Sequence, residues 1–289
     1  MMRITTHCSR LLITLLLLAA SLHVSANNPQ HRIVSAGGTL TEVVYALGAG
    51  DMLVGVDTTS YFPEATGKLP KIGYMRALSS EGILSLNPTL MLASPDAGPP
   101  PVIQQLKQSG LHIENFDYPQ TPEGVADMIR HVAEVVNRKT EAEQLIQSLQ
   151  ADAAKLVSHV QKQTLRPRVL FILDVGRGAP MAGGRDTSAE NIIKLAGGVN
   201  VMDGFEGFKP LNAEAIILAN PDIILVNDRT LRLTGGADKI FAMPGIASSR
   251  AGRERNLITM DGLMLLGFGP RFVEAARELN RKMQQTLNN

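Results

Sequence analysis

Hydrophobic residues in this chain form two kinds of pattern, short continuous apolar runs and longer stretches with apolar residues every three or four positions. The clearest runs, 89–93 and 223–226, each follow an Asn-Pro pair, at 87–88 and 220–221. Proline cannot continue a helix and disfavours helical geometry in the residue before it. Each pair therefore predicts a helix end followed at once by a strand. Runs that are apolar throughout are typical of parallel strands covered on both faces.

The same arrangement occurs twice, 133 residues apart. Segment 78–92 resembles segment 211–225, and each has a matching strand and helix upstream. The upstream parts are strand 32–35 with helix 41–48, and strand 168–174 with helix 188–197 after a glycine-rich loop. Strand, helix and strand in alternation indicate βαβ units. The repeat therefore predicts two Rossmann-like α/β lobes.

A long helical stretch separates the two halves. Thr121 is a good helix cap and Pro122 suits the first helical position. A first amphipathic helix should end near 137–139, and a second should run over about 140–163, roughly 36 Å at ~1.5 Å per residue. We expect this second helix to lie along both lobes as a single stiff spine that permits only small hinge motion. The fold class is therefore α/β, with two Rossmann-like lobes joined by a single long backbone helix.

The first 26 residues have the order of a secretory signal peptide. Arg3 and Arg10 precede or border the apolar run 11–20, and small residues at 24–26 suit a signal peptidase. The run is shorter than the ~20 residues that span a bilayer. We expect cleavage after Ala26 and a periplasmic protein. The predicted domains are the signal peptide 1–26, the N-terminal lobe 27–139, the linking helix 140–165 and the C-terminal lobe 166–289.

Cysteine content and charge exclude several classes. The single cysteine, Cys8, falls within the signal segment, so the mature protein should form no disulfide. The formal net charge is +1, and losing Arg3 and Arg10 with no acidic residue leaves about −1. Near-neutral charge argues against a nucleic-acid partner, which usually requires a basic face. No later apolar stretch is long enough to cross a membrane, so we expect a protein that is not membrane-embedded.

Several segments resemble the binding proteins of bacterial iron-siderophore, cobalamin and haem ABC importers. The repeated helix–Asn-Pro–strand segments resemble markers of that group, and segments 73–86, 180–185 and 243–246 are most similar to its haem-binding branch. The resemblance covers essentially residues 30–287. It implies a monomer that captures ferric haem in the cleft between the lobes. It also implies delivery to an inner-membrane permease dimer with its ATPase subunits.

Tyr74 is the residue that the resemblance makes an axial ligand of the haem iron. Ferric iron is a hard cation, a phenolate is a hard oxygen donor, and tyrosine is an established haem ligand. The phenol must lose its proton to bind well, and Arg76, two residues on, would stabilise the phenolate. A loop tyrosine that only packs its ring is the alternative from the residues alone.

The remaining haem contacts are less defined by the sequence. The glycine-rich loop 174–181 has no histidine, so we expect five-coordinate iron or a weak sixth donor. Within that loop Arg177 could cap the open iron face and Met181 could touch the ring. Propionates need cations, and arginine binds carboxylates bidentately. The candidates are Arg76, Arg177, Arg229 and Arg232, with Lys71 weaker; those for the apolar face are Tyr61, Phe62, Met75, Phe205 and Phe208.

Glu81 and Glu214 occupy equivalent positions in the two repeats. In the family that the chain resembles, such a pair docks onto arginines of the permease dimer. Paired surface acids give orientation and salt-sensitive association. The simpler alternative is a solubilising charge favoured near a helix start by the helix dipole.

Other functions are weighed against this one. A cobalamin or ferric-siderophore binding protein of the same importer class is the first alternative, and a periplasmic hydrolase is the second. The sequence has no phosphate-binding loop, no His-Glu-x-x-His motif and no cysteine nucleophile. None of the four histidines beyond the signal segment lies near a plausible nucleophile. We therefore expect that the chain is not an enzyme.

Overall fold

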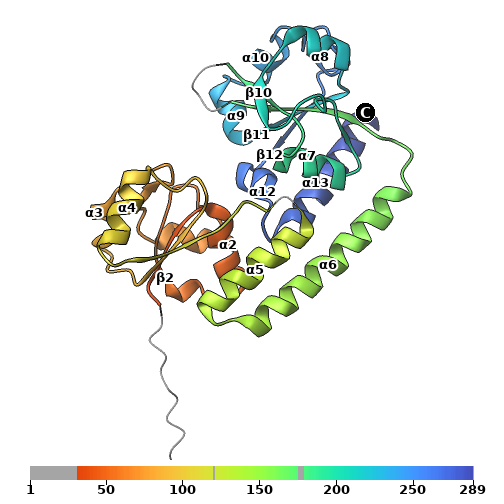
Figure 1. Ribbon diagram of the computed structural model, residues 1–289. Helices are drawn as coiled ribbons and strands as arrows, with labels where there is room; N and C mark the ends of the chain where they lie inside the picture. The colour runs from red at the N-terminus through yellow and green to blue at the C-terminus, as the bar shows by residue number, and fades with distance from the viewer. Residues whose placement is uncertain (1–30, 120, 175–178, 289) are drawn as a thin grey trace, which may run out of the picture. The chain divides into compact units, whose positions relative to one another are not determined.

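Two sheets, each dominated by parallel strands, organise the computed structural model (Figure 1). The structure describes residues 31–119, 121–174 and 179–288. The predicted signal segment, with Cys8, lies outside the described residues. The chain divides into a short unit, Met1–His31, and one compact unit, Arg32–Asn289, which holds every element described below. The predicted two-lobed α/β fold is confirmed within that second unit.

The N-terminal lobe is built on a four-stranded parallel sheet in the order β2-β1-β5-β6. Alternate residues of β1 and β5 contribute to two separate hydrophobic clusters, so both faces of the sheet are covered. This explains why these strands are apolar throughout. The elements are β1 (Ile33–Ala36), α2 (Gly38–Ala46), β2 (Leu53–Val56), β3 (Gly73–Tyr74), β4 (Ala77–Leu78), α3 (Ser80–Leu84), β5 (Leu90–Ala93), α4 (Pro100–Gln108) and β6 (His112–Asn115), with short 3-10 helices at Gly50–Met52 and Glu64–Lys68.

The C-terminal lobe has a six-stranded sheet in the order β10-β8-β7-β11-β12, with β9 beside β7. Strands β7, β11, β12 and β9 pair in parallel, whereas β8 and β10 are antiparallel. The elements are β7 (Arg168–Leu173), β8 (Met181–Gly183), α7 (Ser188–Leu195), β9 (Val199–Asn200), β10 (Phe208–Pro210), α8 (Ala213–Ala219), β11 (Ile223–Asn227), α9 (Asp228–Leu233), α10 (Ala237–Phe241), α11 (Arg250–Glu254), β12 (Leu257–Met260), α12 (Gly262–Leu266) and α13 (Phe272–Asn288).

One local expectation was wrong in this lobe. The segment between β7 and α7 was expected to be only a glycine-rich loop, but Met181–Gly183 forms strand β8. Ala182 pairs with Ile172 of β7 and with Lys209 of β10. The glycines at 183 and 184 concealed the strand, because glycine usually weakens a strand and marks a loop.

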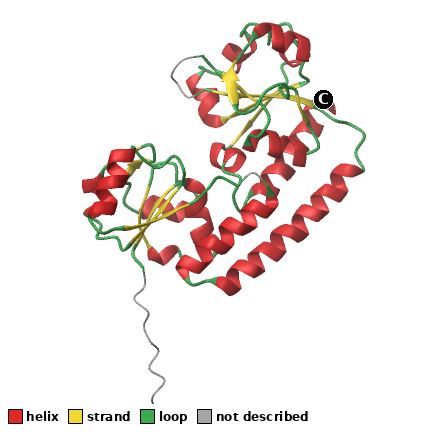
Figure 2. Cartoon of the chain, in the orientation of Figure 1, coloured by secondary structure: helices red, strands yellow, loops and turns green. Residues whose placement is uncertain are grey.

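The linking helices follow the sequence prediction closely. Helix α5 (Pro122–Val136) begins with proline, and the Thr121 hydroxyl accepts a hydrogen bond from the Gly124 amide at 3.1 Å. Asn137 then adopts a left-handed conformation, which ends the helix. Helix α6 (Lys139–Gln161) contacts α5 along part of its length and also contacts α7 and α13 of the C-terminal lobe (Figures 1 and 2). It is therefore the expected spine, although the predicted domain boundaries themselves stay a prediction.

The internal repeat is visible in matching atomic details. Each N-cap side chain accepts a hydrogen bond from the backbone amide three residues further along the chain. Ser79 accepts from Gly82 at 3.4 Å, and Asn212 accepts from Ala215 at 3.1 Å. Asn87 and Asn220 both have positive φ, 47° and 40°, directly before the prolines. Asparagine tolerates this left-handed conformation better than most residues.

An arginine stabilises the end of each repeated helix. Arg32, before β1, donates to the Leu86 carbonyl at 2.8 Å, and Arg168, at the start of β7, donates to the equivalent Ala219 carbonyl at 2.7 Å. These carbonyls lack helical partners, so a cation at the helix C-terminus satisfies them. The two halves therefore share a structural unit and not only a sequence pattern.

Candidate ligand-binding site

Tyr74 is held in a tight hairpin of the N-terminal lobe. Strands β3 and β4 pair through Tyr74 and Ala77, which leaves Met75 and Arg76 as the two-residue turn. Gly73 has a φ of 97°, which side chains rarely permit, so glycine is needed at the entry to the hairpin. The Gly98 amide donates to the Met75 carbonyl at 2.8 Å and fixes the turn. Tyr74 itself is 41% exposed.

Four polar side chains meet at this hairpin, and we call them the tyrosine cluster: Tyr74, Arg76, Asp96 and Tyr118. Arg76 donates through Nη1 to the Tyr74 phenol oxygen at 3.0 Å and through Nη2 to Asp96. Tyr118 donates to the same Asp96 oxygen, Oδ2, at 2.9 Å. Burial, then the hydrogen bond to the Asp96 carboxylate, raises the pKa of Tyr118 to about 12. The pKa of Arg76 is also raised. Burial by itself lowers this pKa, but the interactions of the guanidinium with Asp96 and Tyr74 outweigh that effect.

The cluster lies at the carboxyl edge of the N-terminal sheet. Asp96 follows the end of β5, and Tyr118 follows the end of β6. The Met75 sulfur is 3.6 Å from the hydroxyl of Ser94, which directly follows β5. Open α/β sheets bind their ligands outside the carboxyl ends of their strands. Tyr74 therefore lies at the kind of sheet edge where such folds bind ligands, and its role as an iron ligand stays a prediction.

A buried carboxylate organises the neighbouring loop. Asp57, directly after β2, is fully buried and accepts from the Gly37 amide at 3.0 Å, from Thr59 at 2.8 Å and 2.6 Å, and from the Ser60 hydroxyl at 2.6 Å. This saturation makes Asp57 a structural support, because a buried charge must be paired or hydrogen-bonded. It fixes the loop that carries Tyr61 and Phe62.

That loop joins the edges of the two sheets. The Tyr61 phenol donates to Asp261 at 2.9 Å and accepts from the Leu263 amide at 2.8 Å. Asp261 follows the end of β12, so the carboxyl edges of both sheets meet here. Burial raises the pKa of Tyr61. The Arg271 guanidinium lies 3.7 Å from the Phe62 ring centroid, so Phe62 is already in contact with a protein cation.

A buried ion pair lies at the same junction. Arg271 donates to both carboxylate oxygens of Glu42, whose side chain is 5% exposed. Burial raises the pKa of Glu42, and the interactions with Arg271 only partly oppose it. The Thr39 hydroxyl also donates to the Gly267 carbonyl at 3.0 Å. These contacts connect α2 with the C-terminal lobe.

The structure places the C-terminal candidates apart from the tyrosine cluster. Arg229 is exposed on α9, and Arg232 pairs with Asp228 on the same helix at 3.1 Å. Met181 is half-buried in β8 between Leu173 and Pro210. Among the described residues, no hydrogen bond or ion pair joins these three side chains to the cluster.

Other candidates have structural roles or cannot be placed. Arg177 lies outside the described residues. Lys71, a weaker candidate, donates to the Ser60 and Thr66 carbonyls at 3.0 and 3.1 Å. These bonds make it a support of that loop, and its role as a propionate partner stays a prediction. Phe208 packs on Phe171 at 6.4 Å between ring centroids, and Lys209 lies 5.1 Å from the centre of the Phe205 ring.

Glu81 and Glu214 are exposed in the first turns of α3 and α8. Their equivalent placement is thus preserved in three dimensions. In the described part of the chain, no group of three or more His, Cys, Asp or Glu side chains could hold a metal ion, and no helix is long and apolar enough to span a bilayer.

Of the tyrosine cluster, the sequence singled out Tyr74 and Arg76 but not Asp96 and Tyr118. Asp96 follows β5, a predicted strand, and that position is the signal that would have found it, whereas Tyr118 follows β6, which the sequence analysis did not predict.

This fold defines a two-lobed α/β binding protein with a helical spine, and the tyrosine cluster lies at the carboxyl edge of its N-terminal sheet. Residues 33–262 match the family described as periplasmic binding protein, and the chain belongs to that family. It is a member of the group that serves haem, cobalamin and siderophore import, and that group consists of substrate-binding transport proteins.

Solved structures of similar proteins support the assignment. The apo periplasmic heme-binding protein RhuT from Roseiflexus sp. RS-1 is 39% identical, with a TM-score of 0.84 over 89% of this chain and 99% of that chain. The periplasmic heme-binding protein HutB of Vibrio cholerae is 35% identical, with a TM-score of 0.79 over 88% and 99%. A vitamin B12-binding protein of Vibrio vulnificus strain YJ016 is 26% identical over 76% of this chain and 79% of its own length.

Proposed function

We propose that this protein captures ferric haem in the periplasm, with Tyr74 as an axial ligand of the iron, and delivers it to an ABC importer. The observation that carries the proposal is the exposed Tyr74 phenol, held by Arg76 at the carboxyl edge of the N-terminal sheet. The similarity to haem-binding proteins at 35–39% identity supports haem over cobalamin, because the vitamin B12-binding protein of Vibrio vulnificus is only 26% identical.

The chemistry of Tyr74 suits a trivalent iron. A phenolate oxygen is a hard anionic donor, and the positive charge of Arg76 beside it stabilises the anion that ligates. Iron of the bound haem supplies the remaining driving force for loss of the phenol proton. The iron is five-coordinate or takes a weak sixth donor, and the histidines support this, because His112 and His131 both bond Glu114 and His159 contacts Gln163.

The propionates require a cation that is not already occupied. Arg76 is engaged by Asp96 and Tyr74, so its role in the proposal is to stabilise Tyr74. Arg229 is exposed and follows β11 at the ligand-binding edge, which suits a propionate. Arg232, Arg177 and Met181 remain proposed contacts of the porphyrin from the C-terminal lobe.

The decisive experiment is a titration of the purified mature protein with ferric haem. We expect stoichiometric uptake with a high-spin tyrosinate-type absorption spectrum, and Tyr74→Phe should lose its charge-transfer band and much of the affinity. Tyr45→Phe, on α2, is the matched control and should bind as the wild type does. Cyanocobalamin should not compete. Wild-type binding by Tyr74→Phe, or tighter binding of cyanocobalamin, would refute haem as the cargo.

Delivery uses Glu81 and Glu214, which we propose contact cations of the permease dimer. Two exposed acids on equivalent helices suit a partner with two like sites, and such contacts set orientation and association rate. Reversing both charges should abolish uptake by cells while haem binding in solution stays intact. Unchanged uptake would remove the docking role.

A further inference from the structure

Leu218 on α8 is 88% exposed, the largest exposure of any large hydrophobic side chain among the described residues. Ile217 beside it is 54% exposed. Single apolar residues scattered over a surface are normal, but here two exposed apolar neighbours lie on one short helix. The helix is the one that carries Glu214.

The three side chains share one face of α8. Ile217 and Leu218 follow Glu214 by three and four positions, and residues at these spacings lie side by side on a helix surface. The opposite side of α8 is anchored, because Ile216 is 1% exposed within the core of the C-terminal lobe. The exposed face therefore presents the Glu214 carboxylate next to the apolar side chains of Ile217 and Leu218, which we call the apolar knob.

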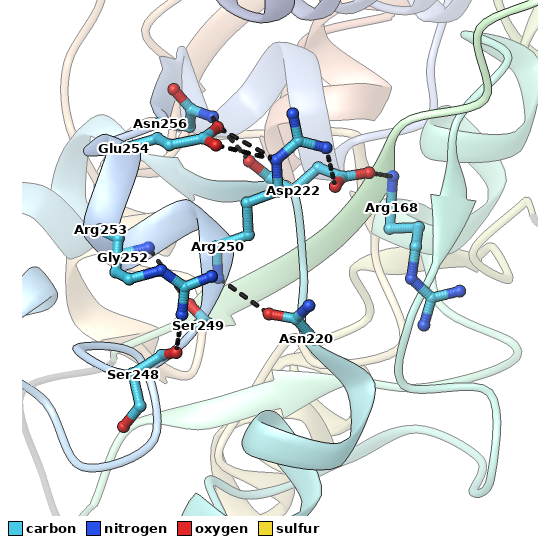
Figure 3. A network of polar contacts seen from close by, with 10 residues as sticks. All are labelled: Arg168, Asn220, Asp222, Ser248, Ser249, Arg250, Gly252, Arg253, Glu254 and Asn256. Carbon is cyan, nitrogen blue, oxygen red and sulfur yellow. Dashed lines mark hydrogen bonds and ion pairs between the residues drawn. The ribbon is translucent and has the colours of Figure 1, made fainter.

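The helix is held firmly, so this exposure does not come from a frayed end. Asn212 caps its start, and Arg168 binds the Ala219 carbonyl at its end. Beyond the end, the Arg250 amide donates to Asn220 at 2.8 Å, and the Arg250 side chain bonds Asp222 at 3.1 Å (Figure 3). Arg250 also bonds Glu254 at 3.0 Å, which adds a further anchor.

The equivalent helix of the N-terminal lobe lacks the apolar knob. The repeat aligns Ile217 with Leu84 and Leu218 with Ser85. Leu84 is half-buried and packs against the core of the N-terminal lobe. The Ser85 hydroxyl donates a hydrogen bond to the Gly82 carbonyl of its own helix at 2.9 Å. The two lobes thus share the glutamate but differ beside it.

From this asymmetry we infer that Ile217 and Leu218 form an apolar contact with the permease, made by the C-terminal lobe alone. The inference rests on the proposed docking role of Glu81 and Glu214. The chemistry of this face defines the partner surface. Glu214 should pair with a cation of the permease, and Leu218, one turn away, should enter an apolar pocket beside that cation. A permease dimer with two like sites would meet Leu218 at one site and Ser85 at the other. The apolar contact would therefore form at one of the two sites only.

The test measures binding of the haem-loaded protein to the permease dimer with its ATPase subunits in lipid nanodiscs. Leu218→Ser should weaken docking roughly ten- to a hundredfold, the range expected when one leucine loses its burial. Leu165→Ser, a 37% exposed leucine between α6 and β7, is the matched control and should dock as the wild type does. Haem binding and thermal unfolding should be unchanged in both variants.

The possible failures are distinguishable. If Leu218→Ser docks normally while Glu214→Lys does not, the apolar contact is refuted and the proposed docking role stands. If the Glu81→Lys and Glu214→Lys pair also docks normally, the docking role itself fails. If Leu218→Ser instead reduces binding to empty nanodiscs or self-association in sedimentation, the knob serves lipid or a second copy, and the inference is overturned.

Discussion

Arg76 donates one hydrogen bond to Tyr74 and a second to Asp96, so a single guanidinium joins the proposed iron ligand to the loop after β5. Tyr118, after β6, completes the connection by donating to the same carboxylate. The position of the arginine therefore depends on two loops distant in sequence from the hairpin. A fixed cation costs less reorganisation when an anion forms beside it than a free side chain does.

Asp96→Asn tests this connection. The substitution keeps the size of the side chain but removes the charge that holds Arg76, so the arginine loses a charge-assisted bond. The pair is partly solvent-exposed, which limits its contribution to about 1 kcal/mol, and haem affinity should fall roughly fivefold. Titration with ferric haem measures this, with Asp96→Glu as the charge-conserving control. An unchanged affinity for Asp96→Asn would show that Arg76 needs no support.

The ionisation of Tyr118 provides a second test. Its pKa of about 12 lies above the ordinary value of 10.0, because burial and Asp96 both favour the neutral phenol. The folded protein thus favours the neutral phenol of Tyr118. The contribution of this phenol to the free energy of unfolding is fully present below pH 10 and is lost as pH rises from about 10 to 12. The ultraviolet difference titration between wild type and Tyr118→Phe should show one phenol ionising near 12. Asp96→Asn should lower that value, and a midpoint near 10 would contradict the geometry.

The sequence predicted most of the fold because its signals were local. The Asn-Pro pairs, the Thr121 cap and the apolar runs each depend on neighbours within a few residues, and each appears as expected in β5, β11 and α5. Strand β8 was missed because pairing with β7 and β10 overrides the local preference of its glycines.

The site was only partly predictable for the same reason. Tyr74 and Arg76 are two residues apart and could be related from sequence alone. Asp96 and Tyr118 join them only because β5 and β6 lie adjacent in the sheet. Lys71 looked like a free cation, yet its two carbonyl partners come from a loop whose path no local pattern specified.

The ion pair between Glu42 and Arg271 predicts a stability effect. Arg271→Gln would leave a carboxylate buried without its cation, at a cost of about 3 kcal/mol in the free energy of unfolding. Glu42→Gln should cost less, because it also removes the charge whose burial is unfavourable. Urea unfolding compares the two variants, and equal losses would argue against burial as the cause.

The same pair gives a pH dependence. The pKa of Glu42 is raised above 4.5 in the folded protein, so the folded state holds its proton more tightly than the unfolded chain does. The contribution of Glu42 to stability therefore falls as pH rises through the window above 4.5. Arg271→Gln should extend that window to higher pH, because the cation that lowers the pKa of Glu42 is gone. Unfolding of this variant at pH 5 and pH 8 should show a steeper loss than in the wild type.

The two left-handed asparagines should respond differently to substitution, although the repeat makes them equivalent. Asn87→Ala and Asn220→Ala should each destabilise by about 1 kcal/mol, because a Cβ without a polar group is strained at positive φ. Asn87→Gly should be nearly neutral, since glycine adopts this conformation freely. Asn220→Gly should still cost about 1 kcal/mol, because its side chain accepts from the Arg250 amide at 2.8 Å and glycine cannot. Urea unfolding of the four variants checks this, and equal behaviour of the two glycine variants would mean that the Arg250 contact adds no stability to the C-terminal repeat.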